Sequence, residues 1–250
     1  MFQGDRMYRH IKEYEIKYTD VDAFDNLKPS SLLSFMEESA CLSADELGFG
    51  YEDIAPKNIG FILANVYIEL FRPVKLGERL EVHTWPIAPK MLIFLRDFEL
   101  FSGSEKVGVC TTRWCMIDIN SFKPLPVNVY FADGAFDSYN KERSVLFTSW
   151  KIPAVTEGKP VGTKRVKLSD YDHYFHVNNT KYADYLYDTF SLEDINGKYF
   201  SKLQITYSKQ CKLGEEIVFT STQSGSEYIV EGRVDGELRV AYKAELSETL

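Results

Sequence analysis

The sequence contains two copies of one pattern, and this internal repeat constrains the fold more than any other feature. The first copy begins at Thr19 and reads TDVDAFDNLKPSSLLSFMEE, and the second begins at Ser169 and reads SDYDHYFHVNNTKYADYLYD. In each copy a polar turn with two aspartates precedes a segment whose apolar residues recur at helical spacing. In a chain of 250 residues, this repetition predicts two similar halves.

A second pair of matching segments follows the first. RPVKLGERLEV begins at Arg72 and KQCKLGEEIVF begins at Lys209, and alternating apolar and polar residues follow both. Such alternation predicts antiparallel strands, and Asp235-Gly236 is a strong signal for a tight hairpin. The stretch SGS at residues 102–104 predicts a second turn, between strands of the first half.

Each half therefore reads as one long helix followed by several antiparallel strands. Pro29 suits the first position of the first helix, and Asn178 or Asn179 suits the N-cap of the second. We expect an α+β fold in which each helix is wrapped by a curved antiparallel sheet and the two units pair within one chain. The predicted domains are 1–150, including a Pro-rich connection from about residue 120, and 151–250.

Composition limits the class of protein. The formal net charge of −8 disfavours generic nucleic-acid binding. No apolar stretch is long enough for a membrane span, and the charged N-terminal residues do not resemble a secretory signal. None of the four cysteines forms a CxxC pair, so we expect reduced thiols and a cytoplasmic protein. They are Cys41, Cys110, Cys115 and Cys211.

Several short motifs carry a resemblance to a known family. HVNNTKY, from His176 to Tyr182 and preceded by Asp170 and Asp172, resembles the signature of acyl-acyl-carrier-protein (acyl-ACP) thioesterases. RDFEL at 96–100 and RWCMID at 113–118 resemble strands of the bacterial members, and YSKQC at 207–211 resembles the plant Y-x-x-E-C. The resemblance covers nearly the whole chain. It implies a tandem (double) hot-dog fold and hydrolysis of fatty-acyl thioesters to free fatty acid in fatty acid biosynthesis, without a cofactor.

The sequence departs from the family pattern at two positions. Tyr174 stands where the family has an asparagine, two residues before the histidine. Gln210 stands where the plant motif has a glutamate, just before Cys211. The first change affects how the histidine or the attacking water is oriented, and the second removes a carboxylate.

Thioester hydrolysis requires an activated nucleophile and a stabilised oxyanion. His176 is the candidate to activate water, because an imidazole titrates near neutrality. Asp172 either orients this imidazole or braces the turn, and Asp22 persists in the first half where Asn26 replaces the histidine. Cys211 is the alternative nucleophile.

The remaining candidates position the substrate. Backbone N–H groups around 177–179 and the side chains of Asn178 and Asn179 suit the oxyanion, and Tyr174 occupies an orienting position. Gln210 can hold the water or the carbonyl but cannot act as a base. His173 and His176 with the nearby aspartates match no standard metal-ligand spacing, so we expect no metal site.

The expected partner is an acidic, phosphopantetheine-bearing acyl carrier protein. Four basic residues just before the site are candidates for its docking, and three helix residues of the first half are candidates to line the acyl pocket. The alternatives are a non-hydrolytic acyl-thioester-binding or regulatory protein, and a hydratase or dehydratase on the same fold. The sequence leaves open whether two copies form a homodimer. The basic residues are Lys159, Lys164, Arg165 and Lys167, and the pocket candidates are Leu32, Phe35 and Met36.

Overall fold

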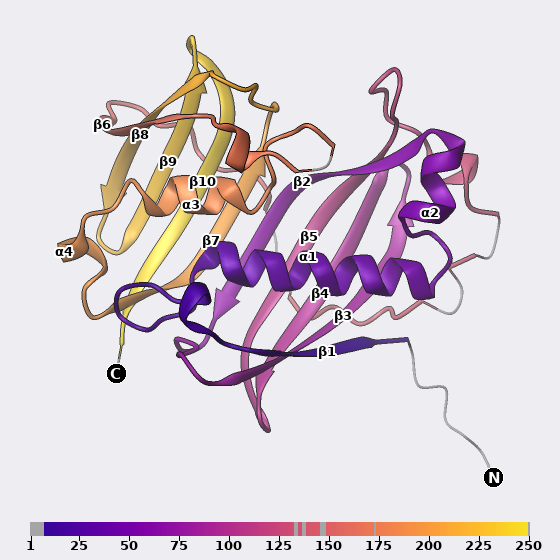
Figure 1. The fold of residues 1–250 in the computed structure, drawn as a ribbon, viewed down its shortest axis with the longest axis horizontal. Helices are drawn as coiled ribbons and strands as arrows, with labels where there is room; N and C mark the ends of the chain where they lie inside the picture. Colours follow the sequence, from indigo (N-terminus) through magenta and orange to yellow (C-terminus); the bar gives the residue numbers. More distant parts are fainter. Residues whose placement is uncertain (1–7, 133–134, 137–138, 146–148, 173, 250) are drawn as a thin grey trace.

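The computed structural model describes residues 8–132, 135–136, 139–145, 149–172 and 174–249. Within these residues the strands form one antiparallel sheet in the order β1-β3-β4-β5-β2-β7-β10-β9-β8-β6 (Figure 1). The strands are β1 His10–Glu15, β2 Ile59–Leu70, β3 Arg79–Lys90, β4 Ile93–Ser102, β5 Glu105–Asp118, β6 Lys159–Arg165, β7 Lys198–Tyr207, β8 Glu216–Ser224, β9 Glu227–Val234 and β10 Glu237–Glu248.

The two halves of this sheet are related by a pseudo-two-fold axis. Strands β1–β5 belong to the first half and β6–β10 to the second, and the halves join where β2 pairs with β7. At this junction Tyr67 pairs with Gln204, and these residues have the same separation in sequence as Arg72 and Lys209. The axis therefore passes between equivalent residues, and the predicted tandem hot-dog fold is confirmed.

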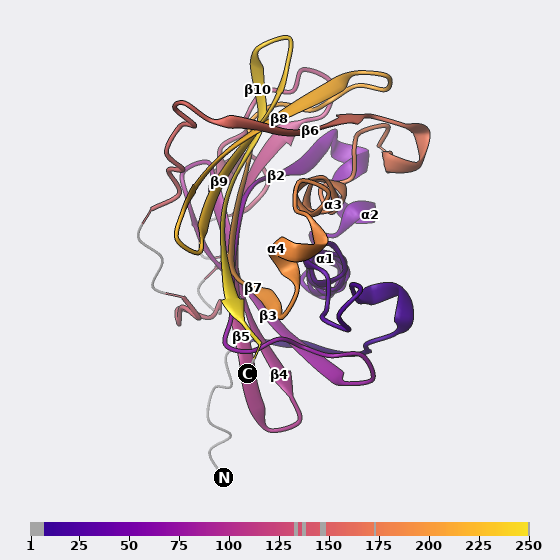
Figure 2. The same ribbon diagram turned by 90° about the vertical axis from the view of Figure 1, so that its left-hand side faces the viewer.

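Helix α1, Pro29–Glu46, is the long helix of the first half and lies across the concave face of the sheet (Figures 1 and 2). Pro29 occupies its first turn as predicted, and the helix ends just before Gly48, whose φ is +74°. Its buried face includes Leu33 and Met36, which pack into the main core. A short helix, α2 Tyr51–Ile54, follows.

The second half lacks the predicted long helix. Helix α3 spans only Lys181–Tyr187, and a separate turn, α4 Leu192–Ile195, follows it. The Thr189 hydroxyl donates to the carbonyl of Leu186 (2.7 Å), and Ser191 and Asp194 form a capping box that begins α4. The expectation of one helix reaching residue 190 is therefore wrong.

The predicted N-cap of the second helix is also wrong. Thr180 occupies that position. Asn178 acts one step earlier, because its Oδ1 accepts hydrogen bonds from the backbone N–H (2.8 Å) and the hydroxyl (2.7 Å) of Thr180. This Asx-type turn uses the same chemistry as a cap, so the residue type indicates a turn but does not fix the first helical residue.

Both predicted hairpins are present. Asp235 and Gly236 connect β9 to β10 with φ angles of 49° and 80°, as a tight two-residue turn of left-handed residues requires. Ser102 pairs with Glu105 across Gly103, whose φ is +59°. These turns set the strand register, and with it the apolar face that the helices cover.

The connection between the halves runs over the convex face of the sheet, opposite the helices (Figure 2). The Trp85 indole N–H donates to the carbonyl of Glu142 (3.0 Å), and the Gln204 amide donates to the carbonyl of Trp150 (2.9 Å). The predicted boundary near residue 150 falls within this connection. No helix in the described ranges is long and apolar enough to cross a membrane.

Candidate active site

The two aspartate turns are built by the same hydrogen bonds. Asp172 Oδ1 accepts from the backbone N–H groups of Tyr174 (2.9 Å) and His176 (3.3 Å). Asp22 Oδ1 accepts from those of Phe24 (2.8 Å) and Asn26 (2.9 Å). Both aspartates therefore brace their turns. Asp172 bonds the backbone of His176 but not its ring, so orientation of the imidazole by Asp172 stays a prediction.

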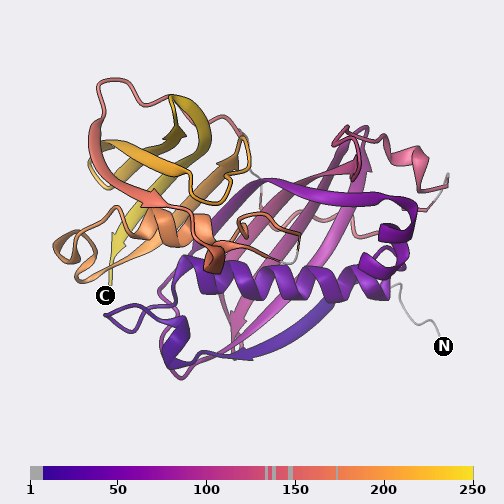
Figure 3. The same cartoon turned by 45° about the horizontal axis from the view of Figure 1, so that its top comes forward.

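His176 is half-buried at the turn that precedes α3, and Figure 3 shows this turn beside the middle of α1. Its ring lies edge-on to that of Phe122, with 6.1 Å between the centroids. Neither ring nitrogen has a hydrogen-bond partner among the residues that the structure describes. Both nitrogens are thus available to water or substrate.

Apolar and polar side chains enclose a cavity next to this turn, which we name the Asn179 cavity. Helix α1 and the first-half strands supply most of its wall, and the second half closes it with residues beside His176. The lining residues are Leu33, Met36, Glu37, Ala40, Leu63, Val66, Phe98, Thr112, Trp114, Asn179, Thr180 and Tyr207.

Of the three residues predicted to line an acyl pocket, one lines the Asn179 cavity, and binding of an acyl chain there stays a prediction. Met36 lines the Asn179 cavity, but Leu32 lines a different cavity. Phe35 stacks on Tyr14, with 4.4 Å between the ring centroids. The helical spacing identified the correct helix, but three residues at that spacing face different neighbours because the sheet curves around α1.

The residues predicted to orient the substrate differ in whether they line the Asn179 cavity. Asn179 lines the cavity, and its carbonyl accepts a hydrogen bond from the Tyr207 hydroxyl (3.1 Å). Asn178 is used internally, because its N–H donates to the carbonyl of Asp170 (2.8 Å) and its side-chain oxygen holds Thr180. Tyr174 is 48% exposed and packs against Tyr51 of α2. Asn179 therefore lines the cavity and Asn178 does not, and a substrate-orienting role for either stays a prediction.

Neither Cys211 nor Gln210 is among the residues that line the Asn179 cavity. Cys211 is only 2% exposed, burial raises the pKa of its thiol, and its N–H donates to the Tyr182 hydroxyl (3.2 Å). The Gln210 Oε1 atom is buried and has no hydrogen-bond partner within the described part of the chain. The thiol environment is that of a core cysteine.

Glu37 is a site residue that sequence reasoning missed. Its carboxylate lines the cavity from α1, and burial raises its pKa, with a further contribution from the negative charge of Asp172. A signal was present, since Glu37 aligns with Tyr187 in the repeat and lies one helical turn from the apolar residues Leu33 and Ala40.

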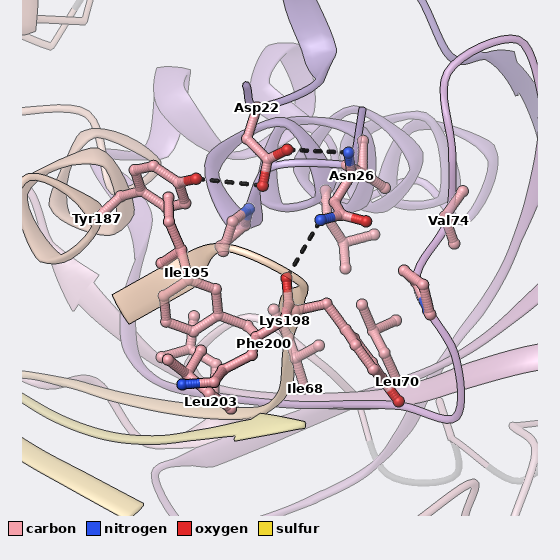
Figure 4. Close-up of a pocket in the computed structure, with 16 residues that line it drawn as sticks. Asp22, Asn26, Ile68, Leu70, Val74, Tyr187, Ile195, Lys198, Phe200 and Leu203 are labelled. Carbon is pink, nitrogen blue, oxygen red and sulfur yellow. Dashed lines mark hydrogen bonds between the residues drawn. The ribbon is translucent and has the colours of Figure 1, made fainter. Parts of the chain in front are cut away.

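A second apolar cavity, the Asn26 cavity, lies at the equivalent turn of the first half (Figure 4). The two cavities have equivalent residues in their walls. Tyr187 of the Asn26 cavity is equivalent to Glu37 of the Asn179 cavity, Pro29 to Asn179, and Leu70 to Tyr207. The first-half turn lacks a histidine, because Asn26 replaces it. The two cavities are thus alike in their apolar lining, but the second-half turn carries an imidazole where the first-half turn carries an amide.

The described residues contain no group of three or more His, Cys, Asp or Glu side chains arranged to hold a metal ion. His173, which entered the metal interpretation, lies outside the described residues.

Comparison with known proteins decides the family. The model of the acyl-ACP thioesterase N-terminal domain matches residues 7–133, and that of the C-terminal domain matches residues 156–245. The chain belongs to the acyl-ACP thioesterase family. Two solved structures share its fold over nearly the whole chain. One is an acyl-ACP thioesterase from Bacteroides thetaiotaomicron (TM-score 0.89, 24% identity, 98% of this chain and 100% of that one). The other is the 12:0-ACP thioesterase from Umbellularia californica (TM-score 0.85, 15% identity, 100% of each chain).

Curated relatives of this acyl-ACP thioesterase family member are distant. The chloroplastic palmitoyl-acyl carrier protein thioesterase of Gossypium hirsutum is 23% identical over 95% of this chain, which spans 60% of that protein. The putative acyl-CoA thioesterase YneP of Bacillus subtilis is 24% identical over 51% of this chain and 93% of its own length. The names of these relatives therefore refer to thioesters of two different carriers, acyl carrier protein and coenzyme A.

Proposed function

We propose that this chain hydrolyses fatty-acyl thioesters of an acyl carrier protein at the second-half turn, releasing free fatty acid and the carrier thiol. One observation supports this most directly. The HVNN segment, which carries His176, contributes Asn179 to the wall of a cavity whose other walls are largely apolar side chains of the first half. An acyl chain held there would place its thioester at the turn.

In the proposed reaction, water attacks the thioester carbonyl carbon and His176 takes one of its protons. A carbon–oxygen bond forms, and the carbonyl electron pair moves to oxygen as an oxyanion near Asn179. Collapse of the oxyanion breaks the carbon–sulfur bond. The electron pair leaves on the pantetheine sulfur, and a thiolate whose conjugate pKa is about 8.5 needs little help from an acid. The proton held by His176 then passes to this sulfur, which gives the carrier thiol and returns the imidazole to its starting state.

We propose water as the nucleophile because Cys211 is buried. Replacing Cys211 with alanine should leave kcat/KM for acyl-ACP within about twofold of wild type. Thiol release measured with a chromogenic thiol reagent tests this, with Cys110→Ala as a second buried-cysteine control. A collapse of activity in Cys211→Ala alone would support the Cys–His alternative.

We propose that the acidic carrier docks near β6. This edge strand carries Lys159 and Arg165 in exposed positions and leads through Lys167 into the active-site turn. Lys164 is already paired with Asp188 (3.2 Å), so the other three are the available cations. The simpler interpretation is a solvated edge strand protected from pairing by its charges.

Changing Lys159, Arg165 and Lys167 together to glutamine should raise KM for acyl-ACP on the order of tenfold through lost electrostatic attraction. Hydrolysis of a small soluble acyl thioester should be unchanged. The matched control is Lys12→Gln with Arg79→Gln, at the opposite end of the sheet. Equal losses on both substrates would contradict docking at β6.

Product analysis separates the proposed function from its alternatives. The protein is incubated with acyl-, 3-hydroxyacyl- and enoyl-ACP, and the products are identified by mass spectrometry. Free acid with free carrier thiol supports hydrolysis. Interconversion of hydroxyacyl and enoyl thioesters would indicate a hydratase or dehydratase, and tight binding without turnover would indicate a regulatory acyl-binding protein.

We also propose a cytoplasmic location, which the four free cysteines support. The sequence leaves open whether two copies form a homodimer. This is tested by the molar mass of the protein in solution by light scattering.

A further inference from the structure

The two turns differ in how their polar side chains are satisfied. In the first half the Tyr187 hydroxyl donates to Asp22 Oδ2 (3.1 Å) (Figure 4). Asn26 donates to the carbonyl of Lys198 (3.2 Å) and accepts from the Lys75 ammonium (2.7 Å). These side chains have partners inside the protein, as expected where polar groups serve structure alone.

In the second half, Glu37 replaces Tyr187. The Tyr187 hydroxyl donates a hydrogen bond to Asp22 in the first half. At the equivalent place in the second half, the Glu37 carboxylate is repelled by Asp172. Glu37 accepts no hydrogen bond from the described residues, and among them the Asp172 carboxylate accepts only the two backbone bonds that brace its turn. Packing of a turn against the helix of the opposite half does not require a carboxylate. Tyr187 of α3 contacts the first-half turn through a hydrogen bond instead.

None of the described residues forms an ion pair with Glu37. Glu37 interacts electrostatically with Asp172 and Tyr174 of the turn, with Tyr207 of β7 and with Cys41 of the next turn of α1. All of these groups are acidic or neutral. A partly buried carboxylate beside a second carboxylate costs stability, and such arrangements are typical of sites that act on a ligand.

We propose that Glu37 is a catalytic residue contributed by the first half to the second-half site, where its carboxylate accepts a hydrogen bond from the attacking water. This inference rests on the proposed function. One O–H group of the water donates a hydrogen bond to Glu37 and keeps its hydrogen. The other hydrogen passes as a proton to His176, while the water oxygen forms the new bond to the carbonyl carbon. Glu37 itself is unchanged at the end of the step.

Replacing Glu37 with glutamine should lower kcat on the order of 100-fold, because a neutral amide holds the water less strongly and does not favour loss of its proton. KM should change little, since the acyl chain keeps its apolar contacts. Glu38→Gln is the matched control, because Glu38 is the next residue of the same helix but is exposed and paired with Lys12. Its kcat should equal that of wild type.

Stability distinguishes catalysis from a structural role. A carboxyl group whose pKa is raised by folding destabilises the fold above that pKa, and this cost is lost as the pH falls through it. Glu37→Gln should therefore have a Tm equal to or above that of wild type at neutral pH, with the gap closing on acidification. A structural role would lower Tm instead.

The pH profile gives a third readout. Wild-type kcat/KM should fall on the acid side as Glu37 becomes protonated, and this component should be absent in Glu37→Gln. Glu37→Asp keeps the charge and should recover part of kcat.

The outcomes separate this inference from the proposed function. Wild-type thiol release from acyl-ACP with normal kcat in Glu37→Gln would overturn the role of Glu37 and leave the function intact. Reduced kcat accompanied by reduced Tm at neutral pH would also overturn it, in favour of a structural role. No thiol release by wild type would overturn both.

Discussion

Replacing His176 with asparagine should lower kcat/KM for acyl-ACP on the order of 1,000-fold, because the site loses the imidazole that takes the proton of the attacking water. Asparagine is the residue at the equivalent position of the first half, Asn26, so the turn already accommodates it. The bracing bonds of Asp172 involve backbone groups and remain. The measurement is steady-state thiol release over a range of acyl-ACP concentrations.

A matched histidine controls for general effects of the substitution. His83 lies on β3 and bonds Glu81 (2.9 Å), away from the Asn179 cavity. His83→Asn should keep wild-type kcat/KM. Full activity in His176→Asn would contradict its role, and the proton acceptor would then have to be a carboxylate of the site.

Replacing Arg143 with leucine should lower the free energy of unfolding by about 3–5 kcal/mol, the usual cost of leaving a buried charge without its partner. The Asp97 side chain is fully buried, and its Oδ2 accepts from Arg143 Nε (2.8 Å) and from the backbone N–H of Ser144 (2.8 Å). Its Oδ1 has no hydrogen-bond partner among the described residues. Arg143 therefore holds the connection onto the convex face of the sheet through this carboxylate.

Urea unfolding measures this effect as a lower midpoint with an unchanged slope. Arg79→Leu is the control, since its pair with Glu13 is exposed and should contribute about 0–1 kcal/mol. Adding Asp97→Asn to Arg143→Leu should restore part of the loss, because the buried charge is then gone. A loss below about 1 kcal/mol in Arg143→Leu would mean that water reaches Asp97.

The repeat predicts the fold because each half alone exposes an apolar face that the other half covers. Equivalent residues such as Tyr67 and Gln204 meet at the junction, as pairing of two similar units requires. The length of α3 was not predictable, because Tyr182, Leu186 and Phe190 keep helical spacing beyond the last helical residue. Hydrogen bonds of Thr189 and Ser191, rather than periodicity, end the helix and start the next one.

The site was predictable only where its signature is local. His176 and Asn179 belong to one motif and lie at the same turn. Glu37 reaches this turn from 135 positions earlier in the chain, through packing of α1 against the opposite half. Cys211 lies in a recognisable motif, but its burial depends on the tyrosines around it.

The most direct test of the account is thiol release by the wild-type protein from a series of acyl-ACPs of different chain lengths, each compared with the matching acyl-coenzyme A. We predict release of thiol and free acid from acyl-ACP, with a higher kcat/KM than from coenzyme A. No release from either carrier, by protein with an intact fold, would contradict hydrolysis at this site.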